Sequence, residues 1–295
     1  MTGRRRLVRV PASSANLGPG YDVLAAAISL HLELEVAEAG EFSVDPGDQP
    51  VPADRSNLCV RAFEALHSAD GLRFEIRSEI PSARGLGSSA AAIVAGLLAA
   101  DHLFELALDR DEIYSRAVEL EGHPDNVGAA LYGGFVVCPQ ASEGSAPRPP
   151  VRLEPPEGVE GVLVVPEAEV PTAEARAAMP PSVPTEDAVA NLAAASQLVL
   201  GIERSDLALI ANGLDDRMHQ PHRAHLFPGS MEVLAEAREL GAIGATISGA
   251  GPAVLVWCFW QDTGKVTDAL RSRVGDWAQV VRAPFSPLGA DVPEL

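Results

Sequence analysis

Lysine is almost absent from this chain, since Lys265 is the only one among 295 residues. A Walker A loop needs a lysine directly after its glycines, and a protein kinase needs one on a strand. Lys265 fits neither pattern, so the sequence excludes ordinary P-loop NTPases and protein kinases. A compositional preference for arginine would explain the shortage equally well, but the exclusion holds under either explanation.

Positive charge and cysteine are also scarce. The chain has 22 basic against 41 acidic residues, a net charge of −19, which disfavours non-specific nucleic-acid binding and docking on anionic membranes. Donors placed locally must therefore hold any anionic substrate. Cys59, Cys138 and Cys258 lack the spacing of a zinc site or a redox pair, so we expect buried thiols in a reducing compartment.

Long apolar runs are missing as well. The most apolar stretch, Ala90 to Ala100, is about half as long as a membrane span, and no apolar segment follows the basic N-terminus as in a signal peptide. Hydrophobic residues still make up 47% of the chain, which excludes a disordered protein. We therefore expect a soluble, cytoplasmic protein with one large or two medium domains.

Strand and helix patterns mix in both halves of the chain, which indicates an α+β or α/β protein with two lobes. Alternating apolar residues predict strands at 7–10 (ended by Pro11), 32–36, 72–80, 161–165, 243–248 and 253–260. Helices are predicted at 56–68, 88–104, 109–121, 185–202, 205–212 and 230–240, before a last helix and strand that end near Ala283. A run rich in Ser, Gly and Pro predicts a linker at 140–156, which divides the chain into lobes 1–155 and 156–295.

The strongest local signal lies where the helix predicted from Ser88 begins. Glycines let the backbone approach an anion closely, and a helix start offers unpaired N–H groups and the positive end of the helix dipole. The segment Gly85-Leu86-Gly87-Ser88-Ser89 therefore predicts a site for phosphate oxygens, with two hydroxyls that suit phosphate or magnesium. A glycine turn with serine caps is the alternative interpretation.

Two other segments place polar side chains on turns. Asn16 and Asp22 lie on a glycine-bent loop that could hold a polar ligand, although an Asx turn is the simpler interpretation. The run 119–126 ends a predicted helix, and its Glu121 suits magnesium better than zinc because the single His123 has no partner at ligand spacing. A second glycine turn at 249–252 is, by itself, most simply a tight turn.

Arg176 and Arg223 could bind a carboxylate or phosphate in two-point geometry, although most arginines are solvated surface residues. Three histidines lie near Arg223 in the sequence, and a metal among them is disfavoured because Pro221 interrupts the helical spacing. They are His219, His222 and His225.

Three segments, in this order, resemble the GHMP family of small-molecule kinases, and they span the chain nearly end to end. They are Val10-Pro11-Ala12-Ser13-Ser14-Ala15-Asn16-Leu17-Gly18-Pro19-Gly20-Tyr21-Asp22, the run from Ile80-Pro81 to Ser89-Ala90, and Ile247-Ser248-Gly249-Ala250-Gly251-Pro252. Further motifs are most similar to the members that phosphorylate homoserine. They are Glu121-Gly122-His123-Pro124-Asp125-Asn126 with Tyr132-Gly133-Gly134, and Gln220-Pro221-His222-Arg223.

The resemblance implies an α+β, two-lobed fold. Its N-terminal lobe would be like ribosomal protein S5 domain 2, its C-terminal lobe ferredoxin-like, and the active site would lie between them. The implied enzyme is a phosphotransferase with an alcohol acceptor, which converts ATP and L-homoserine to ADP and O-phospho-L-homoserine in threonine biosynthesis. ATP and Mg²⁺ are the implied cofactors, a homodimer is one possible assembly, and neither nucleic acid nor membrane is an expected partner.

The resemblance also implies roles for residues at matching positions. The ATP-binding set is Asn57 with Pro81, Ser82, Ala83, Arg84, Gly85, Leu86, Gly87, Ser88 and Ser89. The magnesium ligands are Ser89 and Glu121. The substrate contacts are Asn16, Asp22, His123, Arg176, Arg223 and Gly251, and the residues next to the reacting groups are Asn16, Asp125 and Asn126.

The chemistry of these residues agrees with a zwitterionic substrate. An amino acid needs an acid for its ammonium group and cations for its carboxylate, and Asp22 with the two arginines would supply both. Phosphoryl transfer depends more on alignment and charge neutralisation than on covalent help. Asp125 could be a general base on geometry. Homoserine-phosphorylating members are thought to lack such a base, so we expect Asp125 to be mainly structural.

Three alternatives stay open at this point. One is another GHMP kinase with a different alcohol substrate. A second is a nucleotide-binding protein without turnover, although such a protein should lack phosphate-loop or magnesium residues that are present here. A third is a dinucleotide dehydrogenase, which is disfavoured because no acid lies at the ribose-binding distance after the GxGxxA spacing of 85–90.

Overall fold

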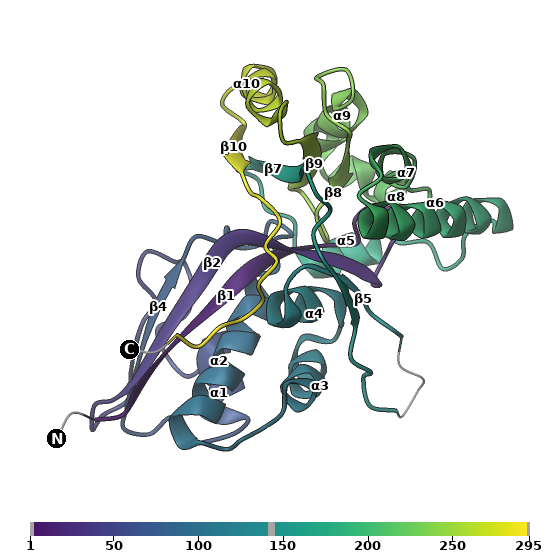
Figure 1. Ribbon diagram of the computed structural model, residues 1–295. Coiled ribbons are helices and arrows are strands. Elements are labelled where there is room, and N and C mark those ends of the chain that lie inside the picture. The colour runs from purple at the N-terminus through teal and green to yellow at the C-terminus, as the bar shows by residue number, and fades with distance from the viewer. Residues whose placement is uncertain (1–2, 141–144, 294–295) are drawn as a thin grey trace.

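A six-stranded sheet organises the first half of the chain in the computed structural model, which describes residues 3–140 and 145–293. The strand order is β3–β4–β2–β5–β6, with β1 paired to β2, and every pair is antiparallel except β3 with β4. The strands are β1 (Arg5–Ala15), β2 (Leu24–Glu38), β3 (Ser43–Asp45), β4 (Leu72–Ser78), β5 (Phe135–Val137) and β6 (Val151–Leu153). Helices lie along one side of β1 and β2 (Figure 1): α1 (Leu58–Glu64), α2 (Ser88–Phe104), α3 (Arg110–Glu121) and α4 (Asp125–Tyr132).

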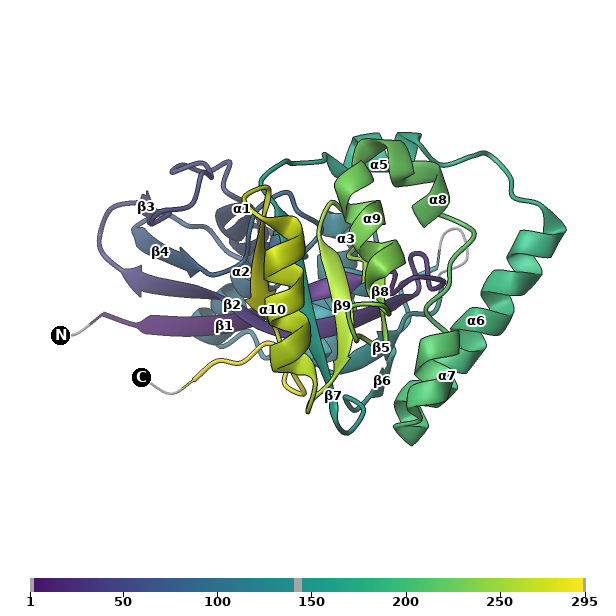
Figure 2. The ribbon, with the colours of Figure 1, turned by 90° about the horizontal axis from the view of Figure 1, so that it is seen from above.

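A four-stranded antiparallel sheet organises the second half, in the order β10–β7–β9–β8. Its strands are β7 (Val159–Pro166), β8 (Gly244–Ile247), β9 (Val254–Phe259) and β10 (Ala278–Arg282). In Figure 2, α9 (Pro228–Glu236) and α10 (Thr263–Val274) cross this sheet, and α6 (Thr185–Arg204) and α7 (Leu207–Asn212) lie at one end of the molecule. The short helices α5 (Thr172–Ala177), α8 (Gln220–Arg223) and η1 (Ala224–Leu226) complete this half.

One hydrophobic core runs through both halves. It joins buried residues of β1, β2 and α2 to residues of β7 and β9. At its centre, Phe135 of β5 lies 5.7 Å from Trp257 of β9, and both rings contact Phe285, at 4.7 and 5.1 Å between centroids. Because aromatic rings bury large areas, this cluster fixes the second sheet against the first.

Several predicted elements are confirmed, and two need correction. Helix α2 begins at Ser88, and α3 follows the predicted cap at Asp109, whose carboxylate accepts a hydrogen bond from the Glu112 N–H at 2.8 Å. The expected end of the first strand at Pro11 is wrong: β1 continues to Ala15, with a register shift between Pro11 and Ala12. A bulge tolerates the missing N–H of proline, so the strand need not stop there.

The second correction concerns the helix predicted at 230–240. Helix α9 runs from Pro228 to Glu236, and residues 237–241 form turns that are closed by the hydrogen bond from the Ala242 N–H to the Ala237 carbonyl at 3.0 Å. The predicted linker at 140–156 includes β6, and residues 141–144 of that linker lie outside the described part of the chain. We keep the lobe boundary between residues 155 and 156 as a proposal.

The last residues of the described chain return to the first sheet. The Ser29 N–H donates to the Pro284 carbonyl, the Ser286 N–H donates to the Ala27 carbonyl, and Arg9 pairs with Asp291. All three cysteines are free and buried, as predicted. None of the described helices combines the length and the apolar character that a membrane crossing would require.

Candidate active site

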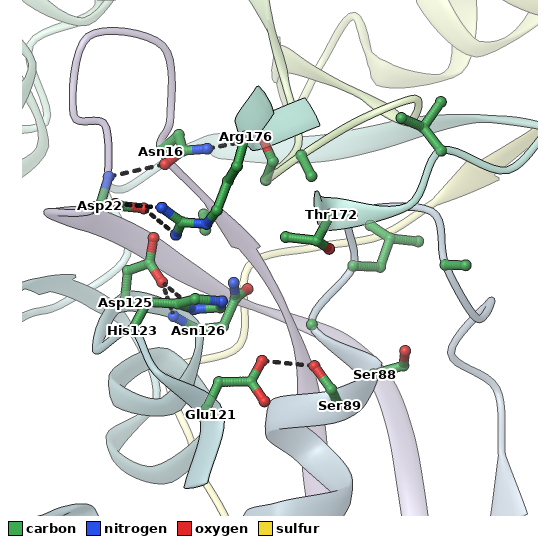
Figure 3. A pocket seen from close by; sticks show the side chains of 18 of the residues that line it. Asn16, Asp22, Ser88, Ser89, Glu121, His123, Asp125, Asn126, Thr172 and Arg176 are labelled. Atoms are coloured by element: carbon green, nitrogen blue, oxygen red, sulfur yellow. Dashed lines mark hydrogen bonds and ion pairs between the residues drawn. The ribbon is translucent and has the colours of Figure 1, made fainter. Parts of the chain in front are cut away.

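A pocket opens where the start of α2 faces α5 and the loop between β1 and β2 (Figure 3). We call it the central pocket. Most of the predicted site residues line it: Asn16, Asp22, Ala83, Gly85, Leu86, Gly87, Ser88, Ser89, Glu121, His123, Asp125, Asn126, Arg176 and Arg223. The fold therefore brings together five segments that lie far apart in the sequence.

One end of the central pocket is formed by backbone. Helix α2 begins after Gly87, no side chain caps its first N–H groups, and its first internal hydrogen bond runs from the Ala91 N–H to the Gly87 carbonyl at 2.9 Å. The free N–H groups and the helix dipole favour an anion here. The alternative reading, a turn capped by its own serines, is wrong, because neither Ser88 nor Ser89 caps the helix.

Glycine is required at two positions of this loop. Gly85 and Gly87 have φ of +75° and +68°, which side chains rarely adopt. A Cβ atom at Gly85 would collide with the carbonyl oxygen of Ser248, and one at Gly87 would collide with the hydroxyl of Ser13. The Ser248 hydroxyl also donates to the Gly85 carbonyl at 2.7 Å, so neighbouring segments hold the loop in place.

A hydroxyl and a carboxylate meet beside the helix start. The Ser89 hydroxyl donates to Glu121 Oε1 at 2.6 Å. Burial raises the pKa of Glu121, and the hydrogen bond from Ser89 opposes that rise. Among the described residues, no group of three or more His, Cys, Asp and Glu side chains converges as a preformed metal site. One hydroxyl and one carboxylate fit Mg²⁺, which usually keeps several waters and takes other ligands from substrate phosphates.

The segment that follows α3 adds a second set of polar groups. Asp125 is 2% exposed, and its Oδ1 accepts from the Asn126 N–H at 2.7 Å and lies 3.5 Å from His123 Nδ1. The nearby Asp125 carboxylate raises the pKa of His123, while burial opposes the rise. Asn126 in turn accepts from the Ser13 hydroxyl at 2.8 Å. Asp125 is thus engaged with its own segment.

Charged side chains form the other end of the central pocket. Asn16 Nδ2 donates to the Gly249 carbonyl at 2.7 Å, and its Oδ1 accepts from the Asp22 N–H at 2.9 Å, so this amide shapes the loop. Arg176 of α5 reaches across and donates to both oxygens of Asp22, at 2.9 and 3.1 Å. These two side chains therefore pair their charges with each other.

Arg223 is the most unusual group in the central pocket. It is 2% exposed and has no carboxylate partner among the described residues. Its guanidinium donates to the Ala175 carbonyl at 2.9 Å, to His219 Nδ1 at 3.2 Å and to the Gly249 carbonyl at 3.4 Å. Burial lowers its pKa. A buried cation without an anion is costly, so this position favours an anionic ligand.

An apolar pocket adjoins the phosphate loop and shares Ser88 and Ser89 with the central pocket. Asn57 and Ser82 line it, together with apolar residues such as Leu32, Val51 and Ile80. Both polar groups of the Asn57 side chain are already used. Its oxygen accepts from the Cys59 N–H at 2.9 Å, and its nitrogen donates to the Pro52 carbonyl at 2.8 Å.

The remaining predicted residues line neither of these two pockets. Arg84 turns away and donates to the backbone carbonyls of Pro166 and Glu167, at 3.0 and 2.7 Å. Gly251 packs beside Phe227, and Pro81 precedes the loop. These three residues support the loops around the site.

Sequence reasoning missed two polar side chains that line the central pocket, Tyr21 and Thr172. The Tyr21 ring lies 5.9 Å from the Arg176 guanidinium and 5.2 Å from that of Arg223. Its position next to Asp22, on a loop already suspected of ligand binding, was a usable signal. Thr172 begins α5 four residues before Arg176, about one helical turn away. Its closeness to a predicted substrate contact was therefore a similar signal.

Known proteins resemble this chain in sequence and in fold. The family model "GHMP kinases N terminal domain" matches residues 57–134, and the model "GHMP kinases C terminal" matches residues 198–275. The chain is 42% identical to a homoserine kinase of Thermus thermophilus over 279 residues, which covers 93% of this chain and 89% of that protein. It is 39% identical to a homoserine kinase of Moorella thermoacetica over 260 residues, 85% of this chain and 87% of that protein.

A solved structure shares the whole fold. The crystal structure of homoserine kinase from Cytophaga hutchinsonii superposes with a TM-score of 0.86 at 28% identity, over 98% of each chain. The chain therefore belongs to the GHMP kinase family, and the predicted two-lobed α+β fold is confirmed. Within that family, its similarity over nearly the full length places it among the homoserine kinases.

Proposed function

We propose that this chain transfers the γ-phosphoryl group of ATP to the hydroxyl of L-homoserine, a step of threonine biosynthesis. One observation carries the proposal: the uncapped start of α2 and the buried, unpaired Arg223 line the same pocket. The first attracts phosphate and the second attracts a carboxylate. Relatives named homoserine kinase support the same reaction.

The nucleotide would extend from the apolar pocket into the central pocket, past the Ser88 and Ser89 that line both. The apolar pocket suits a base, and the free N–H groups after Gly87 suit the triphosphate. Because Ser88 and Ser89 line both pockets, the phosphates would point from the base toward the central pocket. This arrangement favours direct transfer to an acceptor bound there.

Magnesium would be held by Ser89 and Glu121, which already meet at 2.6 Å. Bound there, the ion would neutralise phosphate charge during transfer. The rest of the neutralisation would come from this chain's backbone N–H groups at α2 and from its arginines.

Homoserine would replace the direct contact between Asp22 and Arg176. Its ammonium group would pair with Asp22, and its carboxylate would pair with Arg176 and Arg223, so each charge keeps a partner. Asn16 lies beside this site, where the resemblance places the hydroxyl, and His123 lines the central pocket as an implied substrate contact. Gly251 lines neither pocket, so it would act only through the loop that it supports. A sugar or mevalonate would not need both an acid and two arginines, which disfavours the alternative alcohol substrates.

Asp125 is proposed to be structural and not a general base, because its carboxylate already accepts from the Asn126 N–H and faces His123. A general base typically contributes about 10²–10⁴-fold to the rate. We therefore expect Asp125→Asn to lower kcat by less than about 10²-fold. A loss of about 10³-fold or more, with an unchanged circular dichroism spectrum, would show that Asp125 takes the proton.

A coupled assay of ADP release tests the proposed function directly. The purified chain would be offered ATP with L-homoserine, mevalonate, shikimate or galactose, each with and without Mg²⁺. We expect ADP release that depends on both homoserine and Mg²⁺. Release with another alcohol alone would identify a different GHMP kinase. ATP binding without release would identify a nucleotide-binding protein that has lost turnover.

A cytoplasmic location and a homodimer stay predictions for this chain. The assembly can be measured by sedimentation equilibrium, where a homodimer would give twice the 30.9 kDa of one chain. Neither prediction affects the proposed chemistry, because the described residues of a single chain form the whole central pocket.

A further inference from the structure

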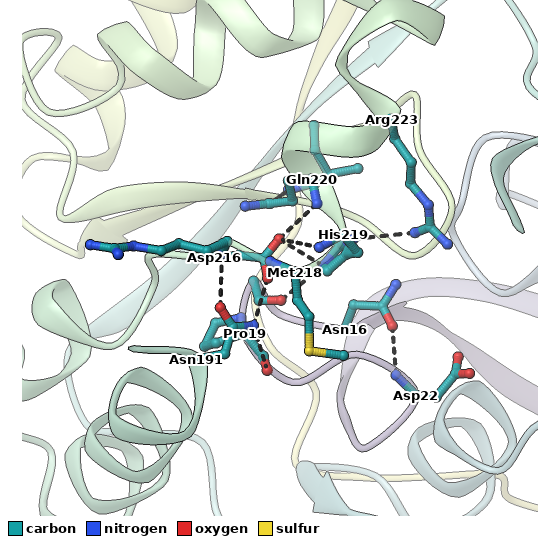
Figure 4. Close-up of polar contacts among 12 residues, drawn as sticks. Asn16, Pro19, Asp22, Asn191, Asp216, Met218, His219, Gln220 and Arg223 are labelled. Atoms are coloured by element: carbon teal, nitrogen blue, oxygen red, sulfur yellow. Dashed lines mark hydrogen bonds and ion pairs between the residues drawn. The ribbon is translucent and has the colours of Figure 1, made fainter. Parts of the chain in front are cut away.

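A buried polar cluster lies next to Arg223, and the proposed function gives it no role (Figure 4). It consists of Asn191 on α6, with Asp216 and His219 on the segment before α8. His219 is fully buried, Asn191 is 4% exposed, and the Asp216 side chain is 0% exposed. Polar groups this deep are costly unless they are fully hydrogen-bonded, so their arrangement is informative.

Asp216 organises the backbone that leads to Arg223. Its carboxylate accepts hydrogen bonds from the N–H groups of residues 218–220 at 2.9, 3.0 and 2.7 Å. It also accepts from Asn191 Nδ2 at 2.7 Å, and Asn191 Oδ1 accepts from the Arg217 N–H at 2.8 Å. These bonds fix the start of α8, the helix that ends at Arg223.

The contacts of His219 define one tautomer. Its Nε2 lies 2.8 Å from the carbonyl oxygen of Gly18, and a carbonyl can only accept, so Nε2 carries the proton. In a neutral imidazole Nδ1 is then an acceptor, and it lies 3.2 Å from Nη1 of Arg223, which can only donate. The neutral Nε2–H form therefore satisfies both neighbours at once.

The groups that face His219 favour this neutral form on balance. Burial lowers its pKa most strongly; nearby Asp216 opposes that effect and Arg223 reinforces it. The Gly18 carbonyl and the charge of Asp22 also favour protonation, but less strongly. The Tyr21 ring is the other neighbour, and its centroid lies 5.4 Å away.

His219 thereby links the two parts of the homoserine site. Gly18 belongs to the loop that carries Asn16 and Asp22, and Arg223 is the buried cation. The Gly249 carbonyl connects the same two parts, because it accepts hydrogen bonds from both Asn16 and Arg223, at 2.7 and 3.4 Å. The His219 imidazole and the Gly249 carbonyl therefore each connect the two parts of the site.

We propose that His219 is a positioning residue for homoserine. As the Nε2–H tautomer, its ring holds Arg223 at a fixed position relative to the loop that carries Asn16 and Asp22. This inference rests on the proposed function. Losing the Arg223 contact should weaken recognition of the homoserine carboxylate. Losing the Gly18 contact should instead disturb the loop that receives the ammonium and hydroxyl groups.

Two conservative variants separate the two contacts. His219→Gln places an amide near the position of Nε2, so it can keep the donor to Gly18 and loses the acceptor for Arg223. His219→Asn places an amide near the position of Nδ1, so it can keep the acceptor and loses the donor. His222→Gln is the matched control, because His222 lies three residues after His219, on α8, and is exposed.

The readout compares L-homoserine with 3-aminopropan-1-ol, which is homoserine without its carboxylate. For His219→Gln we expect kcat/KM for homoserine to fall about 10-fold or more, because a hydrogen bond to a charged group is lost. The KM for ATP and the kcat/KM for 3-aminopropan-1-ol should change less than about twofold. His219→Asn should lower kcat/KM for both alcohols, and the control should match the wild type.

The outcomes distinguish this inference from the proposed function. A wild-type chain that does not phosphorylate homoserine would overturn the function before any variant is compared. If the wild type is active but His219→Gln lowers kcat/KM equally for both alcohols, or for neither, the positioning role is wrong.

A measurement on the wild-type chain covers the case in which the variants do not fold. Nitrogen-15 chemical shifts of labelled histidine report the tautomer of each ring. We expect His219 to be neutral with the proton on Nε2 at pH 7. A proton on Nδ1, or a charged ring at that pH, would overturn the proposal whatever the variants do.

Discussion

The two ends of the central pocket are built from different parts of the chain. The proposed nucleotide end presents backbone N–H groups at the start of α2, which no side chain caps. The proposed homoserine end presents the charged side chains of Asp22, Arg176 and Arg223, which come from three separate segments. Substitutions should therefore act through shape at the first end and through charge at the second.

Gly85→Ala tests the nucleotide end and should have the largest effect. The new Cβ would collide with the Ser248 carbonyl, at a residue whose φ is +75°, so the loop must move. A displacement of about 1 Å can cost 10²-fold in rate, and we expect at least that loss in kcat/KM for ATP. Gly264→Ala is the matched control, because no atom lies within 4 Å of its Cβ position. Equal activity of both variants would contradict a backbone-shaped site.

Removing a positive charge at the homoserine end should have the second-largest effect on activity. Arg223→Met should raise the homoserine KM by about 10–10²-fold, because the substrate loses hydrogen bonds to a buried charged group. Arg176→Met should raise it less, since this side chain is 39% exposed and more screened by water. Steady-state kinetics at saturating ATP measure both. Arg271→Met on the surface of α10 is the control, and an equal change in all three variants would show that charge is not the cause.

Glu121→Gln should affect the metal requirement more than either substrate. The amide keeps the size of the side chain but removes the negative charge beside Ser89. We expect the Mg²⁺ concentration for half-maximal activity to rise about 10-fold, with little change in the homoserine KM. Glu119→Gln, exposed two residues earlier, should leave it unchanged. If the two variants behaved alike, Glu121 would not hold the metal.

Acidification should give the smallest effect, through stability. The pKa of His219 is lowered from 6.5, mainly by burial, so the unfolded chain binds a proton at a pH where the folded chain does not. The stabilisation from neutral His219 is therefore present above about pH 6.5 and is lost as the pH falls through the lowered value. Urea unfolding at pH 7.5 and 5.5 should show a larger loss for the wild type than for His219→Gln. Parallel losses would contradict this effect.

The nucleotide end could be predicted from the sequence because its signals are local. Glycines, serines and an alanine-rich helix lie within a few residues of one another, and α2 begins at the predicted Ser88. The same locality explains the error at Pro11. A proline usually ends a strand, but here a register shift accommodates it, and that shift depends on the pairing of β1 with β2.

The homoserine end could be predicted only in part, because its contacts are non-local. Single residues such as Asp22 and Arg223 could be named from motifs, but not that Arg176 pairs directly with Asp22. The return of residues 284–291 to the first sheet, and the bridge from Gly18 through His219 to Arg223, join positions far apart in the chain. Local patterns carry no information about such contacts.

The most direct test is a crystal structure of the chain with a non-hydrolysable ATP analogue, Mg²⁺ and L-homoserine. We expect phosphate oxygens on the N–H groups that follow Gly87, and the homoserine carboxylate on Arg176 and Arg223 with its ammonium group on Asp22. Phosphates bound away from the start of α2, or homoserine bound with Asp22 and Arg176 still paired, would contradict this account of the site.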